Sequence, residues 1–96
     1  TLNGIVFDSK KEMQYAQTLN LMLKAKLITD YKMQVPYEIV VNGKKICKYV
    51  LDFLVSYGDG HIEHVDVKSE MTIILPVYRL KSKLMQACHG ITIIEK

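Results

Sequence analysis

Two turn signals constrain this chain more than any other feature of its sequence. Asn42-Gly43 lies between two runs of β-branched residues, and this pair tolerates the positive φ angles that a two-residue hairpin turn requires. We therefore predict a hairpin with strands over about Val35–Val41 and Lys45–Ser56. Gly58-Asp59-Gly60 forms a second turn, and His61–Lys68 returns as a third strand. The centre of the chain is thus expected to be an antiparallel meander.

Helical patterns stand on both sides of this meander. The first helix is expected from about Ser9 to Ile28, because Ser9 and Glu12 have the spacing of a capping box. Its apolar stripe consists of Ala16, Leu19, Leu23 and Leu27. Glu12 shares the face of that stripe, which places a carboxylate on the inward side of the helix.

The last third of the chain predicts a crossover. Pro76 favours a helix start, Val77–His89 continues as a helix, and Gly90 suits the position after its end. Ile91–Ile94 then forms a fourth strand, which the helix allows to pair in parallel with the third. We predict a single α/β domain (more narrowly α+β) over residues 1–96, of order αβββαβ, with a mixed central sheet flanked by helices.

Composition narrows the possible functions without choosing one. The length of 96 residues accommodates one domain. No apolar run approaches the roughly 18 residues that span a bilayer, so we expect a soluble protein without a membrane partner. Cys47 and Cys88 lack metal-type or redox-type spacing, which favours reduced thiols in the cytosol. A net charge of +3 permits a polyanion partner but does not require one.

Strand pairing predicts an acidic cluster. A three-residue second turn pairs Tyr57 with His61 and sets Asp52 opposite Asp66, with Cβ atoms roughly 4.5–5.5 Å apart. Facing like charges repel, and Lys68 points to the same side of its strand as Asp66. Two carboxylates and a lysine suit Mg²⁺, which polarises a phosphoryl oxygen and lowers the pKa of a bound water.

Other interpretations of these residues stay open. Asp52, Asp66 and Lys68 also fit a purely structural ion pair at a strand edge. The carboxylate of Glu12 fits the capping box alone. Six basic residues are candidate phosphate contacts, and an ordinary solvated surface explains them equally. These are Arg79, Lys81 and Lys83 on the second helix, together with Lys44, Lys45 and Lys48.

The acidic pattern resembles a known motif. Glu12 in a first helix, Asp52 late in one strand and Asp66-Val67-Lys68 in the next resemble the PD-(D/E)XK nuclease motif, and the αβββαβ order resembles the restriction-endonuclease-like core. More narrowly, the chain is similar to a small phage and prophage nuclease family, formerly a domain of unknown function, related to Holliday-junction resolvases. Leu51 stands where the name-giving pattern has proline. The resembling stretches are 4–12, 34–38, 49–53, 65–68 and 78–84.

The resemblance implies a site and an activity. Asp52, Asp66, Glu12 and the backbone carbonyl of Val67 would bind Mg²⁺, or Mn²⁺ in its place, without any organic cofactor. Lys68 would be catalytic together with the three carboxylates, and Gln34 would support the site. The implied enzyme is a metal-dependent endodeoxyribonuclease that hydrolyses phosphodiester bonds in branched or duplex DNA, as in phage recombination. It would act in the cytoplasm of a bacterial host.

A homodimer is the expected assembly. A four-way junction requires two symmetric cuts, so we expect a homodimer. Met71–Leu75 is a candidate interface, or else an ordinary loop or edge strand. The rival function is a non-catalytic DNA-binding or assembly module on a nuclease fold, and a nuclease directed at RNA is a third alternative.

Overall fold

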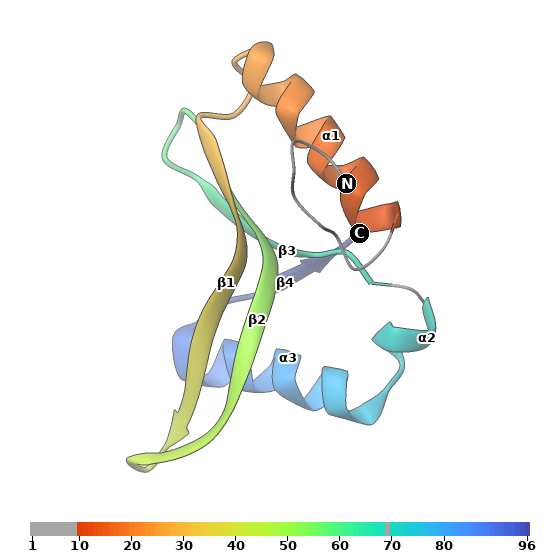
Figure 1. Ribbon diagram of the computed structural model, residues 1–96. Coiled ribbons are helices and arrows are strands. Elements are labelled where there is room, and N and C mark those ends of the chain that lie inside the picture. The colour runs from red at the N-terminus through yellow and green to blue at the C-terminus, as the bar shows by residue number, and fades with distance from the viewer. Residues whose placement is uncertain (1–9, 69) are drawn as a thin grey trace.

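The computed structural model describes residues 10–68 and 70–96, without the side chains of Glu70 and Met71. Its elements are α1 (Lys10–Lys24), β1 (Asp30–Val41), β2 (Lys44–Ser56), β3 (Ile62–Asp66), α2 (Glu70–Ile73), α3 (Pro76–His89) and β4 (Ile93–Glu95). The strands form one sheet in the order β1-β2-β3-β4, antiparallel except for the parallel pair β3–β4 (Figure 1). The expected αβββαβ fold with a mixed sheet is confirmed, and the one-turn α2 is an addition to it.

Both turns form as the sequence predicts. Asn42 and Gly43 have φ angles of 53° and 78°, the positive values that their hairpin turn requires. The Tyr57 amide donates to the His61 carbonyl at 2.9 Å across the second turn. Phe53 consequently pairs with Val65, and the next position brings Asp52 opposite Asp66.

The end of the first helix was predicted wrongly. α1 ends at Lys24 rather than near Ile28, because Lys26 adopts a φ of 61°. The Leu27 amide donates to the Met22 carbonyl at 2.9 Å, and this bond satisfies a terminal carbonyl as in a Schellman motif. Leu27 therefore leaves the apolar stripe and is 63% exposed. The capping box cannot be described, since Ser9 lies outside the described residues.

Strand boundaries also differ from the prediction, and β4 covers Ile93–Glu95 instead of Ile91–Ile94. β1 begins at Asp30 instead of Val35, because Tyr31 and Met33 pack against the core beneath the sheet. β3 ends at Asp66 instead of Lys68. After Asp66, the Val67 amide donates to the Asp52 carboxylate instead of to a backbone carbonyl of the neighbouring strand.

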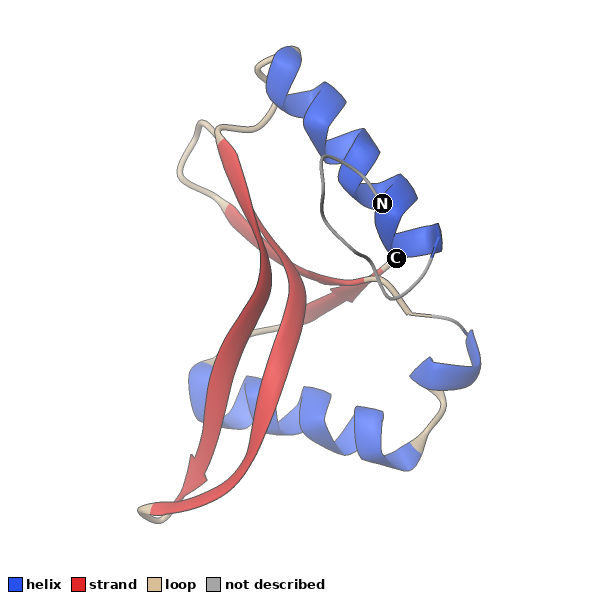
Figure 2. Ribbon diagram, viewed as in Figure 1, coloured by secondary structure: helices blue, strands red, loops and turns tan. Residues whose placement is uncertain are grey.

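Two hydrophobic clusters hold the helices against the sheet. The α1 core consists of Ala16, Leu19, Ile28, Phe53, Val55, Val65 and Val67. The α3 core consists of Ile39, Tyr49, Leu51 and Met85, with the free thiols Cys47 and Cys88 packed against it. β1 and β2 are long and curved. In Figure 2, α1 lies beside their upper part and α3 crosses their lower part. Asp52 lies between Leu51 of one core and Phe53 of the other, at the boundary between them.

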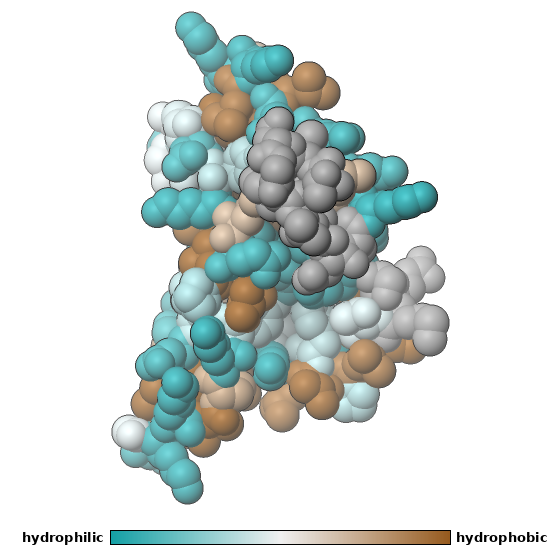
Figure 3. All heavy atoms as spheres, in the orientation of Figure 1, coloured by the Kyte–Doolittle hydropathy of each residue, from teal (hydrophilic) through white to brown (hydrophobic). Residues whose placement is uncertain are grey.

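The face of the molecule in Figure 3 mixes polar and apolar side chains. In Figure 3, apolar side chains gather along the lower edge, over the turn between α2 and α3. The large exposed apolar residues of this region are Ile74, Leu75, Val77 and Leu80. In the described part of the chain, none of the helices combines the length and apolar character needed to cross a membrane.

Candidate active site

Asp52 and Asp66 lie together, and Lys68 contacts Asp52. Both carboxylates are buried, with Asp66 fully shielded from solvent. The Asp52 amide donates to Asp66 Oδ1 at 3.1 Å, and the Val67 amide donates to Asp52 Oδ2 at 2.9 Å. Lys68 Nζ lies 3.0 Å from Asp52 Oδ2 and 3.3 Å from Asp52 Oδ1. The predicted acidic cluster with its cation is therefore present in the fold.

Burial and charge shift the pKa values of this cluster. Burial is the main cause that raises the pKa of Asp66, although the Asp52 amide and the charge of Lys68 act in the opposite direction. Burial by itself lowers the pKa of Lys68, but its hydrogen bond to Asp52 and the charges of the surrounding carboxylates outweigh burial and raise it. Lys68 is therefore held as a cation, and Asp66 is the carboxylate whose ionised form the fold disfavours.

Glu12 and Gln34 reach the same region. Glu12 is 4% exposed on α1, and its charge contributes to the raised pKa of Lys68. Gln34 lies opposite Asp52 between the paired positions of β1 and β2, and its Nε2 is 3.5 Å from Glu12 Oε1. Its φ of 54° is unusual for a strand residue other than glycine, and such outliers occur preferentially at functional sites. Both predicted residues are thus placed beside the acidic cluster.

Two tyrosines that the sequence analysis did not select bind Asp66. The hydroxyl of Tyr49, from β2, donates to Asp66 Oδ2. The hydroxyl of Tyr78, from the first turn of α3, donates to the same oxygen at 3.3 Å. No spacing rule connects the start of a helix to a carboxylate on a strand, so the sequence contained no pattern that would identify them.

A pocket of about 140 Å³ opens beside this cluster. Its lining residues are Tyr49, Val50, Asp66, Lys68, Tyr78 and Lys81. Lys81 Nζ donates to the Lys48 carbonyl at 3.4 Å, so α3 brings a second cation next to β2. Lys11, at the start of α1, donates to the Lys68 carbonyl at 3.0 Å and is a further cation that the sequence analysis missed.

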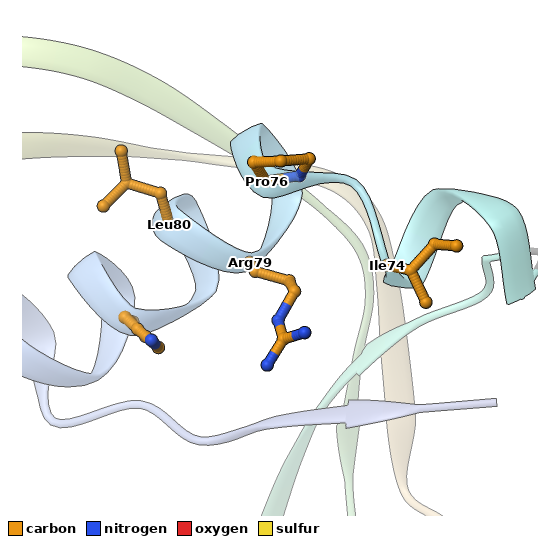
Figure 4. Close-up of a pocket in the computed structure, with 5 residues that line it drawn as sticks. Ile74, Pro76, Arg79 and Leu80 are labelled. Carbon is orange, nitrogen blue, oxygen red and sulfur yellow. The ribbon is translucent and has the colours of Figure 1, made fainter.

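The six predicted phosphate contacts do not share one surface. Arg79 and Lys83 are four residues apart, so they lie on one side of α3, while Lys81 points away from them. A separate pocket of about 330 Å³ contains them (Figure 4), lined by Ile74, Pro76, Arg79, Leu80 and Lys83. Lys45 Nζ pairs with Glu38 at 3.0 Å, and Lys44 begins β2 beside the first turn. Of the six, Lys81 alone lines the pocket of Asp66 and Lys68, and Lys48 contacts it through its backbone carbonyl.

The family comparison covers this whole region. A family model described as "Protein of unknown function (DUF1064)" matches residues 1–90. The chain belongs to the DUF1064 family. The match includes every element from α1 to α3, and with them the acidic cluster. Comparison with curated proteins and with solved structures finds no significant match in either.

The donor set of the DUF1064 site suits a hard cation. Among the described side chains, no three His, Cys, Asp or Glu residues are arranged as a ready metal group. Asp52 and Asp66 nevertheless supply adjacent buried carboxylates, and oxygen ligands of this kind are those that Mg²⁺ prefers. A cation would also relieve the cost of burying the charge of Asp66. The residues present therefore fit a divalent metal with two carboxylate ligands and further oxygen donors.

Proposed function

We propose that this chain is a metal-dependent endodeoxyribonuclease of the PD-(D/E)XK type. One observation carries the proposal. Lys68 Nζ binds the Asp52 carboxylate, and the Asp52 amide binds the Asp66 carboxylate, beside a pocket that also contains Lys81. Buried carboxylates, a lysine and an open pocket are the components of metal-assisted phosphodiester hydrolysis.

Four residues would hold the metal in this proposal. Asp52 and Asp66 provide carboxylates from adjacent strands, Val67 provides its backbone carbonyl, and Glu12 completes the set from α1. Mg²⁺, or Mn²⁺ in its place, would polarise a phosphoryl oxygen of the substrate and lower the pKa of a bound water.

The chain's own cations would act on the phosphate. Lys68 remains charged, so its ammonium can orient the attacking water and stabilise the charge that develops on the phosphoryl oxygens. Lys81 and Lys11 lie close enough to the site to contact flanking phosphates, which positions a strand without reading its bases. Gln34 holds the Glu12 carboxylate toward the site.

Branched DNA in the cytoplasm of a phage-infected bacterium is the proposed substrate and setting. The discriminating experiment is cleavage of a labelled four-way junction beside a linear duplex of the same arms, each with Mg²⁺, Mn²⁺ or chelator. We expect metal-dependent, paired cuts in the junction. Lys68→Ala should lower the rate roughly 10²–10³-fold, the loss typical of removing one group that stabilises the transition state.

A matched lysine variant serves as the control. Lys24 lies in the last turn of α1, at the opposite end from Glu12, so Lys24→Ala should cut at the wild-type rate. Equal cutting of junction and duplex would retain the nuclease and remove the branch preference. Cleavage of RNA alone would change the substrate class. If the protein cuts no DNA with any metal and its DNA affinity is the same with and without chelator, it is a non-catalytic DNA-binding module instead.

A homodimer is the proposed assembly. Ile74 and Leu80 are 67% and 59% exposed in the apolar region over the turn between α2 and α3, and contiguous exposed apolar residues mark interaction surfaces. Leu80→Glu is therefore expected to convert a dimer into a monomer, as measured by light scattering after gel filtration. Leu21→Glu, at a 66% exposed leucine of α1, should leave the mass unchanged. A monomeric wild type, or a Leu80→Glu dimer, would contradict this interface.

A further inference from the structure

The hydrogen bonds to Asp66 leave little of its carboxylate open. An ionised carboxylate has about four lone-pair positions, two on each oxygen. The hydroxyls of Tyr49 and Tyr78 occupy the two positions of Oδ2. The Asp52 amide occupies one position of Oδ1. With respect to the described residues, one acceptor position therefore stays open, and it belongs to Oδ1.

Asp52 is restricted in a similar way. Its Oδ2 accepts from the Val67 amide and lies 3.0 Å from Lys68 Nζ. Its Oδ1 accepts from Lys68 Nζ at 3.3 Å and keeps one position open. Within the part of the chain that the structure describes, each buried aspartate thus offers one oxygen, and neither can grip a cation with both oxygens unless a hydrogen bond breaks.

We propose that Tyr49 and Tyr78 are positioning residues that select the metal, because they hold Asp66 to one-oxygen ligation. The inference rests on the proposed metal site and adds its selectivity to it. Mg²⁺ and ions of similar size bind in compact octahedra and accept single carboxylate oxygens together with water. Ca²⁺ takes six to eight oxygens and often binds a carboxylate through both. Because the two tyrosine hydroxyls occupy Oδ2, Asp66 can offer a metal only Oδ1, and this favours Mg²⁺ over Ca²⁺.

The two phenols are well placed to act as permanent donors. A phenol keeps its proton at neutral pH, so the Tyr78 hydroxyl can donate to Asp66 Oδ2. Tyr49 is 4% exposed within the α3 core, so its ring cannot turn away without disturbing that packing. Tyr78 belongs to α3 and Tyr49 to β2, so both hydroxyls bind Asp66 Oδ2 only when α3 packs on the sheet.

The test measures metal affinity directly and needs no catalysis. Binding of MgCl2 and of CaCl2 is measured by calorimetry on wild type, Tyr78→Phe and Tyr49→Phe. We expect wild type to prefer Mg²⁺. Each substitution removes one hydroxyl and frees a position on Asp66 Oδ2, so the ratio of Ca²⁺ to Mg²⁺ affinity should rise about tenfold, equivalent to about 1.4 kcal/mol.

The chain provides a matched control for these variants. The Tyr57 hydroxyl donates to Glu63 Oε1 at 2.6 Å, and this bond lies at the second turn, away from Asp66. Tyr57→Phe therefore removes the same kind of phenol–carboxylate bond, and the affinity ratio should stay at the wild-type value.

The outcomes separate this inference from the nuclease proposal. An unchanged affinity ratio in both Tyr78→Phe and Tyr49→Phe would overturn metal selection by the tyrosines, even if the protein cuts DNA. A wild type that binds neither ion would overturn both the selection and the metal site. Binding with the expected ratios in a protein that cuts no DNA would support the selection and remove only the nuclease.

Discussion

Asp66→Asn is expected to abolish DNA cleavage and, at the same time, to stabilise the metal-free protein. The substitution removes a proposed metal ligand, and a loss of several kcal/mol in transition-state stabilisation corresponds to roughly a 10⁴-fold lower rate. It also removes a charge that is fully buried beside Tyr49 and Tyr78. An amide of the same shape can keep these contacts, because its Oδ1 can accept from the Asp52 amide while its Nδ2 donates to the hydroxyl oxygens of Tyr49 and Tyr78. It does so without the desolvation cost of an anion.

The sign of the stability change depends on pH. Because burial raises the pKa of Asp66 in the folded state above its usual value of 3.8, the folded chain holds this proton more tightly than the unfolded chain does. The protonated Asp66 carboxyl therefore contributes to the free energy of unfolding. This contribution is fully present below the pKa of Asp66 in the unfolded chain and is lost as the pH rises through its pKa in the folded chain. Wild type and Asp66→Asn should therefore be equally stable in acid and diverge toward neutral pH, where the variant gains about 1 kcal/mol.

Thermal unfolding in chelator across a pH series measures this divergence. For a domain of this size, 1 kcal/mol corresponds to a Tm shift of about 4–8 °C. Asp30→Asn changes an exposed carboxylate at the start of β1 and should follow wild type at every pH. A variant Tm below wild type at neutral pH would show that the Asp66 anion contributes to the fold. Added Mg²⁺ should raise the Tm of wild type but not that of Asp66→Asn, because the variant lacks a proposed metal ligand.

Phe53→Ala is expected to remove much of the stability of the fold. Phe53 is 1% exposed in the α1 core. Its ring meets Tyr15 of α1 edge to face at 5.0 Å between centroids and meets Tyr31 of β1 at 6.2 Å. Truncation of a buried phenylalanine costs about 3–5 kcal/mol, a large part of the roughly 5–15 kcal/mol that holds a domain together.

Urea unfolding followed by circular dichroism measures this loss. Ile46→Ala is the matched control, because Ile46 lies in the same strand but is 53% exposed, and its cost should stay within about 0.5 kcal/mol. Equal midpoints for the two variants would show that the α1 core does not carry the fold. Since Phe53 follows Asp52 directly, surviving folded Phe53→Ala protein should also bind metal more weakly.

The sequence alone was sufficient for the features that depend on local rules. Asn42-Gly43 and the turn at residues 58–60 determine two hairpins, because few residues accept their backbone angles at low cost. A turn of known length also determines strand register, so the pairing of Asp52 with Asp66 could be predicted. The end of α1 could not, because a lysine at position 26 took the left-handed conformation that glycine usually provides.

Only the tertiary structure decided which side chains of α3 meet the acidic cluster. Tyr78 reaches Asp66, and Lys81 joins the same pocket while Arg79 lies elsewhere, because α3 docks on the α3 core in one particular orientation. That orientation results from many weak packing contacts summed over the helix face, and no short pattern in the sequence encodes such a sum. Turns and register are determined by a few neighbouring residues, whereas the surroundings of the Asp66 carboxylate are determined by the whole core.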